Sequence, residues 1–212
     1  MDVSTLEFYS LFCSQFMLLM WTVKERYKLI NDYFITMMIC QNSFELKNSK
    51  LRNVMRLNNQ LIKIVDDISF YYGLPMIMII GVGFLVIILC TFVGIKISIT
   101  ENNWNHFSIS FAAIFYNIIL LSYFIGIVSV GHWVKSEFQK TVSLVHKFLT
   151  NVKDEKIIKT FLDFSFQLLH RKPNFCCGLF SFDLKLAFTM FGAAATYLVI
   201  AIQMDTAVSK HV

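Results

Sequence analysis

The chain has 212 residues, of which 56% are apolar and only 16% are charged. Soluble domains average about 45–50% apolar and about 25% charged residues, so this composition favours a membrane protein. The formal net charge of +5 would also suit a nucleic-acid partner, but the basic residues flank apolar stretches long enough to cross a bilayer. The charge therefore gives no reason to expect nucleic acid as a partner.

The first apolar stretch, Phe8–Trp21, is shorter than the roughly 20 residues that a spanning helix needs. It has no basic start and no small-residue cleavage site, so it does not resemble a signal peptide. We interpret it as a buried amphipathic segment or as the inner part of a truncated span. Residues 1–40 are thus predicted to hold the end of a truncated membrane helix and a cytoplasmic helical extension, and residues 45–73 a cytoplasmic helix.

Three later stretches, which begin near Leu74, Phe107 and Leu186, are long enough to cross a bilayer. The predicted fold is an all-α polytopic membrane helix bundle with cytoplasmic helix extensions, comprising about three full spans and part of a fourth. We expect transmembrane helices at 74–98, 107–130 and 184–204, cytoplasmic helices at 131–183, and an extracellular tail at 205–212.

The helical spacing of apolar residues continues beyond the spans. It runs from Leu51 into the first span and onward from Val134 after the second, and it returns in a separate helix predicted at Ile157–Leu169. Because helices of this kind must bury their apolar stripes, we expect a cytoplasmic bundle, formed within one chain or between subunits.

The orientation follows from the basic residues. The two long connections hold eight lysines and arginines each, whereas the loop between the first two spans holds only Lys96 and the tail only Lys210. Since basic residues concentrate on the cytoplasmic side, the long connections are predicted to be cytoplasmic. The short loop near Asn102–His106 and the C-terminus are then extracellular.

Polar residues are few inside the spans, and Thr91, Asn117 and Ser122 stand out. We favour the interpretation that each hydrogen-bonds a neighbouring helix or its own backbone. The alternative is a small-molecule pocket near the outer leaflet, shared with aromatic residues. Those aromatic residues are Phe92, Trp104, Phe111, Phe115 and Tyr116. The sequence assigns no ligand-binding residue.

The last span carries a stripe of unusual chemistry. Thr196, Ile200 and Gln203 fall at i, i+4 and i+7 and therefore share one helix face. An unpaired amide in hydrocarbon costs several kcal/mol, so Gln203 is expected to face a partner helix or water. This face either lines a pore or makes a buried interhelical contact, and its chemistry alone favours the contact.

The same helix carries a family signature in Thr196, Tyr197, Gln203 and Met204. Thr-Tyr, five apolar residues, Gln and one large apolar residue resembles the C-terminal signature of insect gustatory receptors, in which Phe usually stands where this chain has Met204. Cys177–Leu184 and Tyr72–Pro75 are similar to further stretches of that family. The resemblance covers most of this chain but about the C-terminal half of a typical member, which predicts a truncated member or a C-terminal half.

The resemblance implies a cation channel around a four-fold axis lined by the last helix. Carried onto this sequence, Ile200 is the apolar constriction and Gln203 the polar ring outside it. A hydrophobic constriction gates by dewetting, and an amide ring partly replaces an ion's hydration shell, so weak cation selectivity is expected. Our own inference is that Asp205 adds negative charge at the mouth.

Other chemistry has little support in the sequence. The five histidines show no metal-ligand spacing, and neither a CxxC pair nor a glycine-rich phosphate loop occurs. We therefore expect no enzyme, no cofactor and no metal.

The predicted function is that of a gustatory (taste) chemoreceptor, a ligand-gated non-selective cation channel subunit of the plasma membrane. The expected partners are a small-molecule tastant, membrane lipid, and further receptor subunits in a homo- or hetero-tetramer. The alternative is a truncated, non-conducting membrane subunit that associates with full-length receptors.

Overall fold

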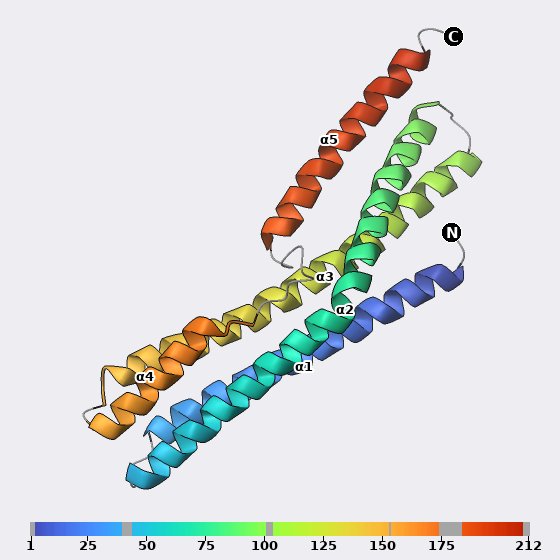
Figure 1. Cartoon of the computed structure of the whole chain (residues 1–212). Coiled ribbons are helices and arrows are strands. Elements are labelled where there is room, and N and C mark those ends of the chain that lie inside the picture. The colour runs from blue at the N-terminus through green and yellow to red at the C-terminus, as the bar shows by residue number, and fades with distance from the viewer. Residues whose placement is uncertain (1–2, 40–43, 101–103, 153, 174–183, 210–212) are drawn as a thin grey trace. The chain divides into compact units, whose positions relative to one another are not determined.

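The computed structural model describes residues 3–39, 44–100, 104–152, 154–173 and 184–209. Every regular element in these ranges is an α-helix, which confirms the predicted all-α fold (Figure 1). The helices are α1 (Val3–Ile39), α2 (Phe44–Thr100), α3 (Trp104–Leu149), α4 (Glu155–His170) and α5 (Leu184–Ser209). Cys177–Asp183 of the family-like run, residues 101–103 of the predicted outer loop and residues 210–212 of the predicted tail lie outside the described residues.

Three helices of the described part are long and apolar enough to cross a membrane, and they are α2, α3 and α5. With 57 and 46 residues, α2 and α3 are much longer than the roughly 20 residues a span requires. Both helices therefore extend well beyond a bilayer, as the continuing apolar period predicts. α2 runs through Pro75 without ending, although proline supplies no backbone N–H to the helix.

The chain divides into two compact units. The span unit comprises residues 1–14, 74–129 and 182–212, and the extension unit comprises residues 15–73 and 130–181. The division falls within α1, α2 and α3, so each of these helices contributes one part to each unit. In α2 and α3 it falls at Leu74 and Val130, where the apolar stretches of the sequence begin and end.

The extension unit has an aromatic core. Phe34 of α1 is fully buried, and its ring lies 5.5 Å from that of Phe148, 6.1 Å from that of Phe161 and 6.4 Å from that of Phe164, centroid to centroid. All three pairs have the edge-to-face arrangement that aromatic rings prefer. These contacts bring α1, α3 and α4 together within one chain.

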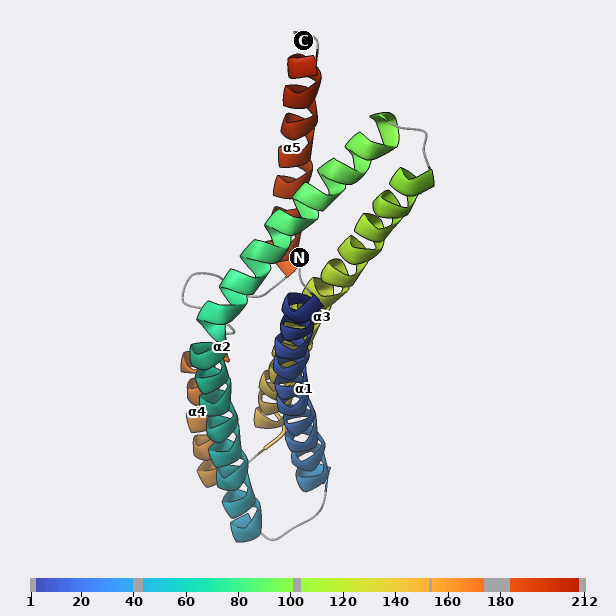
Figure 2. The ribbon, with the colours of Figure 1, turned by 90° about the vertical axis from the view of Figure 1, so that its right-hand side faces the viewer.

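α4 is the most clearly amphipathic helix of the extension unit, and Figure 2 shows it alongside the first half of α2. The Thr160 hydroxyl donates to the Asn48 side-chain oxygen of α2 at 3.0 Å. α4 begins two residues before the predicted Ile157, because the Asp154 carboxylate accepts a hydrogen bond from the Lys156 backbone N–H at 3.0 Å and caps the first turn.

Candidate functional site

The candidate pore-lining helix, α5, is built almost entirely from apolar and small residues. Its polar groups are partly satisfied within the helix, since the Thr196 hydroxyl donates to the Gly192 carbonyl oxygen at 3.0 Å. Such a bond from residue i to i−4 lets a threonine lie in an apolar helix without a partner helix. Gly192 itself is exposed, and a Cβ added there would meet nothing within 4 Å.

The predicted face of Thr196, Ile200 and Gln203 is exposed in the single chain, and Ile200 keeps 45% of its surface accessible. Only 6% of the most apolar stretch of α5 is buried, against 17% for α2 and 28% for α3. The other described helices of this chain therefore do not bury this face. The described helices thus leave most of the stripe uncovered.

A different side of α5 faces the rest of the span unit. The Asp205 carboxylate lies 2.6 Å from the Lys96 ammonium group of α2, and the Phe191 ring packs edge-to-face against Phe124 of α3 at 6.1 Å. Asp205 follows Gln203 by two residues, which is about 200° around the helix at 3.6 residues per turn. Asp205 therefore points toward α2 and away from the candidate pore face.

This ion pair alters the expectation that Asp205 adds negative charge at a pore mouth. The carboxylate is paired with Lys96, and both groups lie at the same end of their helices. Sequence reasoning missed the pair because helical periodicity gives the face of a residue but not its partner. The available signal was a single lysine and a single aspartate, each just after a long apolar stretch.

A small apolar cavity with a volume of about 30 Å³ lies among the described residues of the span unit. It lies between α1, α2, α3 and α5, and its lining includes Tyr9, Gly83, Leu120 and Phe191. At this size it holds about one water molecule. A small-molecule tastant does not fit into it.

Gly83 permits a close approach between α1 and α2. A Cβ at this position would lie 3.2 Å from the Tyr9 hydroxyl oxygen, which is tighter than ordinary van der Waals contact. The Tyr9 ring also packs edge-to-face against Tyr123 of α3, with 6.0 Å between the centroids. The start of α1 is thus held against both neighbouring spans.

The favoured interpretation of the polar residues inside the spans is confirmed. The Asn117 side-chain amide donates to the Thr91 hydroxyl at 3.1 Å, and that hydroxyl donates to the Ile87 carbonyl at 2.7 Å. The Ser122 hydroxyl donates to the Ile119 carbonyl at 2.7 Å. The Asn117 amide oxygen is buried and accepts no hydrogen bond from the described residues.

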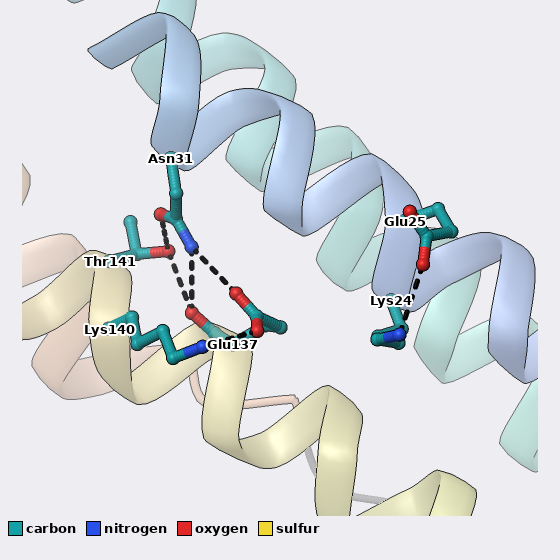
Figure 3. Close-up of polar contacts among 6 residues, drawn as sticks. All are labelled: Lys24, Glu25, Asn31, Glu137, Lys140 and Thr141. Atoms are coloured by element: carbon teal, nitrogen blue, oxygen red, sulfur yellow. Dashed lines mark hydrogen bonds and ion pairs between the residues drawn. The ribbon is translucent and has the colours of Figure 1, made fainter. Parts of the chain in front are cut away.

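The extension unit contains a larger polar network, shown in Figure 3. The Asn31 amide of α1 donates to the Glu137 carbonyl oxygen at 3.0 Å, and the Thr141 hydroxyl donates to the Asn31 amide oxygen at 2.7 Å. The Lys140 ammonium group lies 2.6 Å from the Glu137 carboxylate. Asn31 and Thr141 are buried, so this network fixes the register of α1 against α3.

Lys24 forms a second polar feature of the extension unit, separate from this network in Figure 3. Its ammonium group lies 3.8 Å from the ring centroid of Trp21 and 5.7 Å from that of Trp133, and it pairs with the Glu25 carboxylate at 3.0 Å. The described residues contain no group of three or more His, Cys, Asp or Glu side chains that could hold a metal ion.

The sequence profile of the family described as "7tm Chemosensory receptor" matches residues 3–208. This chain belongs to that family. It is 26% identical over 161 residues to gustatory receptor 28b of Drosophila melanogaster, a match that covers 74% of this chain. It is 30% identical over 157 residues to gustatory receptor 28a of the same fly, which covers 72% of this chain. The resemblance to insect gustatory receptors is confirmed.

The matches cover 34% and 35% of these two relatives, so this chain spans about a third of their length. The family is a receptor family rather than an enzyme family. This chain thus belongs to a family of membrane receptors and has three candidate spans among its described residues.

Proposed function

We propose that this chain is a taste chemoreceptor subunit whose α5 lines a ligand-gated, non-selective cation pore in the plasma membrane. The observation that carries the proposal is the exposed face of Thr196, Ile200 and Gln203 on a helix that the other described residues barely cover. Thr196 and Gln203 give this exposed face a polar character that lipid does not favour, so the face is expected to meet water or another subunit.

Four copies of α5 around a common axis would satisfy this requirement. Small residues let helix backbones approach closely in lipid, and Gly192–Ala195 form the turn directly before Thr196, the first residue of the candidate pore face. A ring of Ile200 side chains then forms an apolar constriction that gates by dewetting, and a ring of Gln203 amides offers oxygen atoms to a partly dehydrated cation. Because amides carry no charge, we expect weak cation selectivity.

The distribution of basic residues supports the proposed orientation. All 19 lysines and arginines lie in the extension unit except Lys96, Lys185 and Lys210. Positive residues concentrate on the cytoplasmic side of a membrane, so we expect the extension unit in the cytoplasm and the end of α5 outside. The names of the two relatives support a small-molecule tastant as the ligand, and no catalytic activity is proposed.

A second candidate function is a membrane subunit that joins full-length receptors without conducting by itself. What favours it is the small volume of the cavity between the described parts of α1, α2, α3 and α5, about 30 Å³, which is well below the size of typical ligand pockets. We infer that helices from another chain complete a tastant pocket. Both candidates place α5 at an interface with other subunits, and they differ in whether this chain alone gives a current.

To test the proposal, we record whole-cell currents from cells that express this chain alone while applying a panel of sugars and bitter compounds. We compare wild type with Gln203→Cys and with Met204→Cys, which lies at nearly the same depth but about 100° around the helix. Met204 is 65% exposed, so both cysteines are accessible in a single chain. A cationic thiol reagent is expected to reduce the ligand-evoked current of Gln203→Cys and to leave that of Met204→Cys unchanged.

Two other outcomes contradict the proposal. If the reagent inhibits the two cysteine variants equally, its effect does not depend on the face of α5, which contradicts a pore lined by the Gln203 face. The absence of any current despite confirmed surface expression favours the non-conducting subunit, which is tested by whether co-expression with a full-length relative alters the current of that relative.

A further inference from the structure

A second cavity lies in the extension unit, between α2 and the end of α4. It has a volume of about 380 Å³, within the range of about 300–1,000 Å³ that is typical of ligand pockets. Its lining is largely polar and comes from two helices distant in sequence. The lining residues are Ile62, Lys63, Asp66, Leu169, His170, Arg171 and Lys172.

Three basic side chains line this cavity. Lys63, Arg171 and Lys172 are all exposed, and none of them forms an ion pair with a described residue. Asp66 is the one carboxylate among the lining residues, so the charge of the lining remains positive. Cations that are held together without compensating partners repel one another, and a multiply charged anion would relieve that repulsion.

The end of α4 is locally well defined. The helix ends at His170, and the Arg171 backbone N–H donates to the Gln167 carbonyl oxygen at 2.9 Å. Pro173 is buried, so the basic residues between these points are held on both sides. Basic residues often occur at helix C-termini because they complement the helix dipole, but this does not account for Lys63, which comes from α2.

The cavity also lies close to the expected membrane surface. Phe70 and Tyr71 of α2 are 81% and 72% exposed, and they precede the span that begins near Leu74. Exposed aromatic residues at such positions are typical of the membrane–water interface. Lys63 is seven residues before Phe70, about 10 Å along the helix, so its long side chain is near enough to meet a projecting lipid head group.

We propose that this crevice binds an anion carrying several phosphate groups, of the kind present in phosphoinositide head groups and in soluble inositol phosphates. Lys63 binds one phosphate group from α2, and Arg171 and Lys172 bind another from the end of α4. Basic pockets on the cytoplasmic side of membrane proteins recognise such head groups. The proposal uses the cytoplasmic placement of the extension unit but is independent of whether α5 forms a pore.

The test uses the full 212-residue chain, purified in detergent and labelled for microscale thermophoresis. The probes are short-chain phosphatidylinositol bisphosphate, short-chain phosphatidylcholine and inositol trisphosphate. We expect the bisphosphate lipid to bind at least about tenfold more tightly than phosphatidylcholine, in proportion to the charge it brings. If inositol trisphosphate binds with similar strength, a soluble anion can supply the phosphate groups. If only the lipid binds, the membrane supplies them. Either result supports the site.

Variants separate the pocket from general surface charge. The triple variant Lys63→Gln, Arg171→Gln, Lys172→Gln is expected to bind the bisphosphate lipid at least about tenfold more weakly. The matched control Arg26→Gln, Lys28→Gln, Lys159→Gln removes the same charges from exposed positions of the extension unit outside the cavity and is expected to change binding less than about twofold. Circular dichroism verifies that both variants keep the helix content of wild type.

Asp66→Asn provides a test in the opposite direction, because it removes the carboxylate of the lining and should tighten binding severalfold. The proposal is overturned if the pocket variant and the control variant lose affinity equally, or if wild type binds the bisphosphate lipid no better than phosphatidylcholine.

Discussion

The extension unit and the span unit contain similar apolar side chains, but aromatic residues that are buried in one have counterparts that are exposed in the other. In the extension unit, aromatic residues such as Phe34, Phe161 and Phe164 are fully buried within a single chain. In the span unit, Phe111, Phe188 and Met204 keep 65%, 76% and 65% of their surfaces exposed. In lipid, apolar exposure carries no penalty, and helices associate through packing and polar contacts instead.

This difference in burial indicates which interactions stabilise each unit. The extension unit gains from removing apolar surface from water, as a soluble helix bundle does. The span unit has little of that contribution within one chain, so its arrangement depends on a few close contacts, on lipid and on other subunits. Substitutions of the same kind should therefore have different effects in the two units.

The largest expected contrast is between two phenylalanines. Phe34→Ala removes a fully buried ring of the extension unit and should destabilise it by about 3–5 kcal/mol, the usual cost of truncating a core phenylalanine. The control, Phe188→Ala in the span unit, truncates a ring that is 76% exposed and should change stability by less than about 0.5 kcal/mol. Equilibrium unfolding in detergent measures both, and equal losses would contradict a core closed within one chain.

The next contrast is between two asparagines. Asn31→Leu removes three hydrogen bonds, two donated to Glu137 and one accepted from the Thr141 hydroxyl, and leaves that hydroxyl only its 3.3 Å bond to the Glu137 carbonyl, so it should cost about 2–3 kcal/mol. Asn117→Leu should cost less than about 1 kcal/mol, because the Thr91 hydroxyl still donates to Ile87 and the Asn117 oxygen is already unpaired. The same unfolding measurement compares them, and a larger loss for Asn117→Leu would contradict the assignment.

These asparagines also mark the limit of sequence reasoning. The helical period predicts the faces of α2, α3 and α4, and the apolar stretches predict the three candidate spans. No local pattern predicts that Asn31 meets Thr141, 110 residues later, because periodicity specifies a face and not the helix that covers it. For the same reason, the stripe on α5 is readable in the sequence, while the pairing of Asp205 with Lys96 is not.

The buried side chain of Tyr27 makes the stability of the extension unit depend on pH. Burial, followed by the charge of Asp66, raises the pKa of Tyr27 above its ordinary value of 10. The folded state then retains a proton that the unfolded state releases, so this contribution to stability is complete below about pH 10 and declines as the pH rises further. Tyr27→Phe should reduce that decline by on the order of 1 kcal/mol at about pH 11.

The control for this titration is Tyr33→Phe, which alters a tyrosine that is 45% exposed. At pH 7, Tyr27→Phe should be neutral to within about 1 kcal/mol, because the buried Tyr27 hydroxyl has no hydrogen-bond partner among the described residues. Thermal unfolding from pH 7 to pH 11 follows both variants. An identical decline in the two would show that the Tyr27 hydroxyl does not govern the alkaline loss of stability.

Two glycines of the span unit give a smaller contrast. Gly81→Ala adds a Cβ with nothing within 4 Å and should stabilise α2 by about 0.5–1 kcal/mol, since alanine restricts the unfolded chain. Gly83→Ala should lose that gain, because its Cβ would lie 3.2 Å from the Tyr9 hydroxyl oxygen. Adding Tyr9→Phe to Gly83→Ala should restore it, and thermal unfolding of the four proteins decides whether this contact limits the approach of α1 to α2.

The smallest expected effect concerns the ion pair that holds α5 against α2. Lys96 is exposed and Asp205 is partly exposed, so the pair should contribute only about 0.2–1 kcal/mol and less at high salt. Asp205→Lys places two positive charges together and should destabilise the span unit, whereas the double exchange Lys96→Asp, Asp205→Lys should recover most of the loss. Because the pair joins the end of α5 to α2, even this small energy biases which face of α5 is left for water or a neighbouring subunit. A double exchange that fails to recover stability would mean that the pair does not set the rotation of α5.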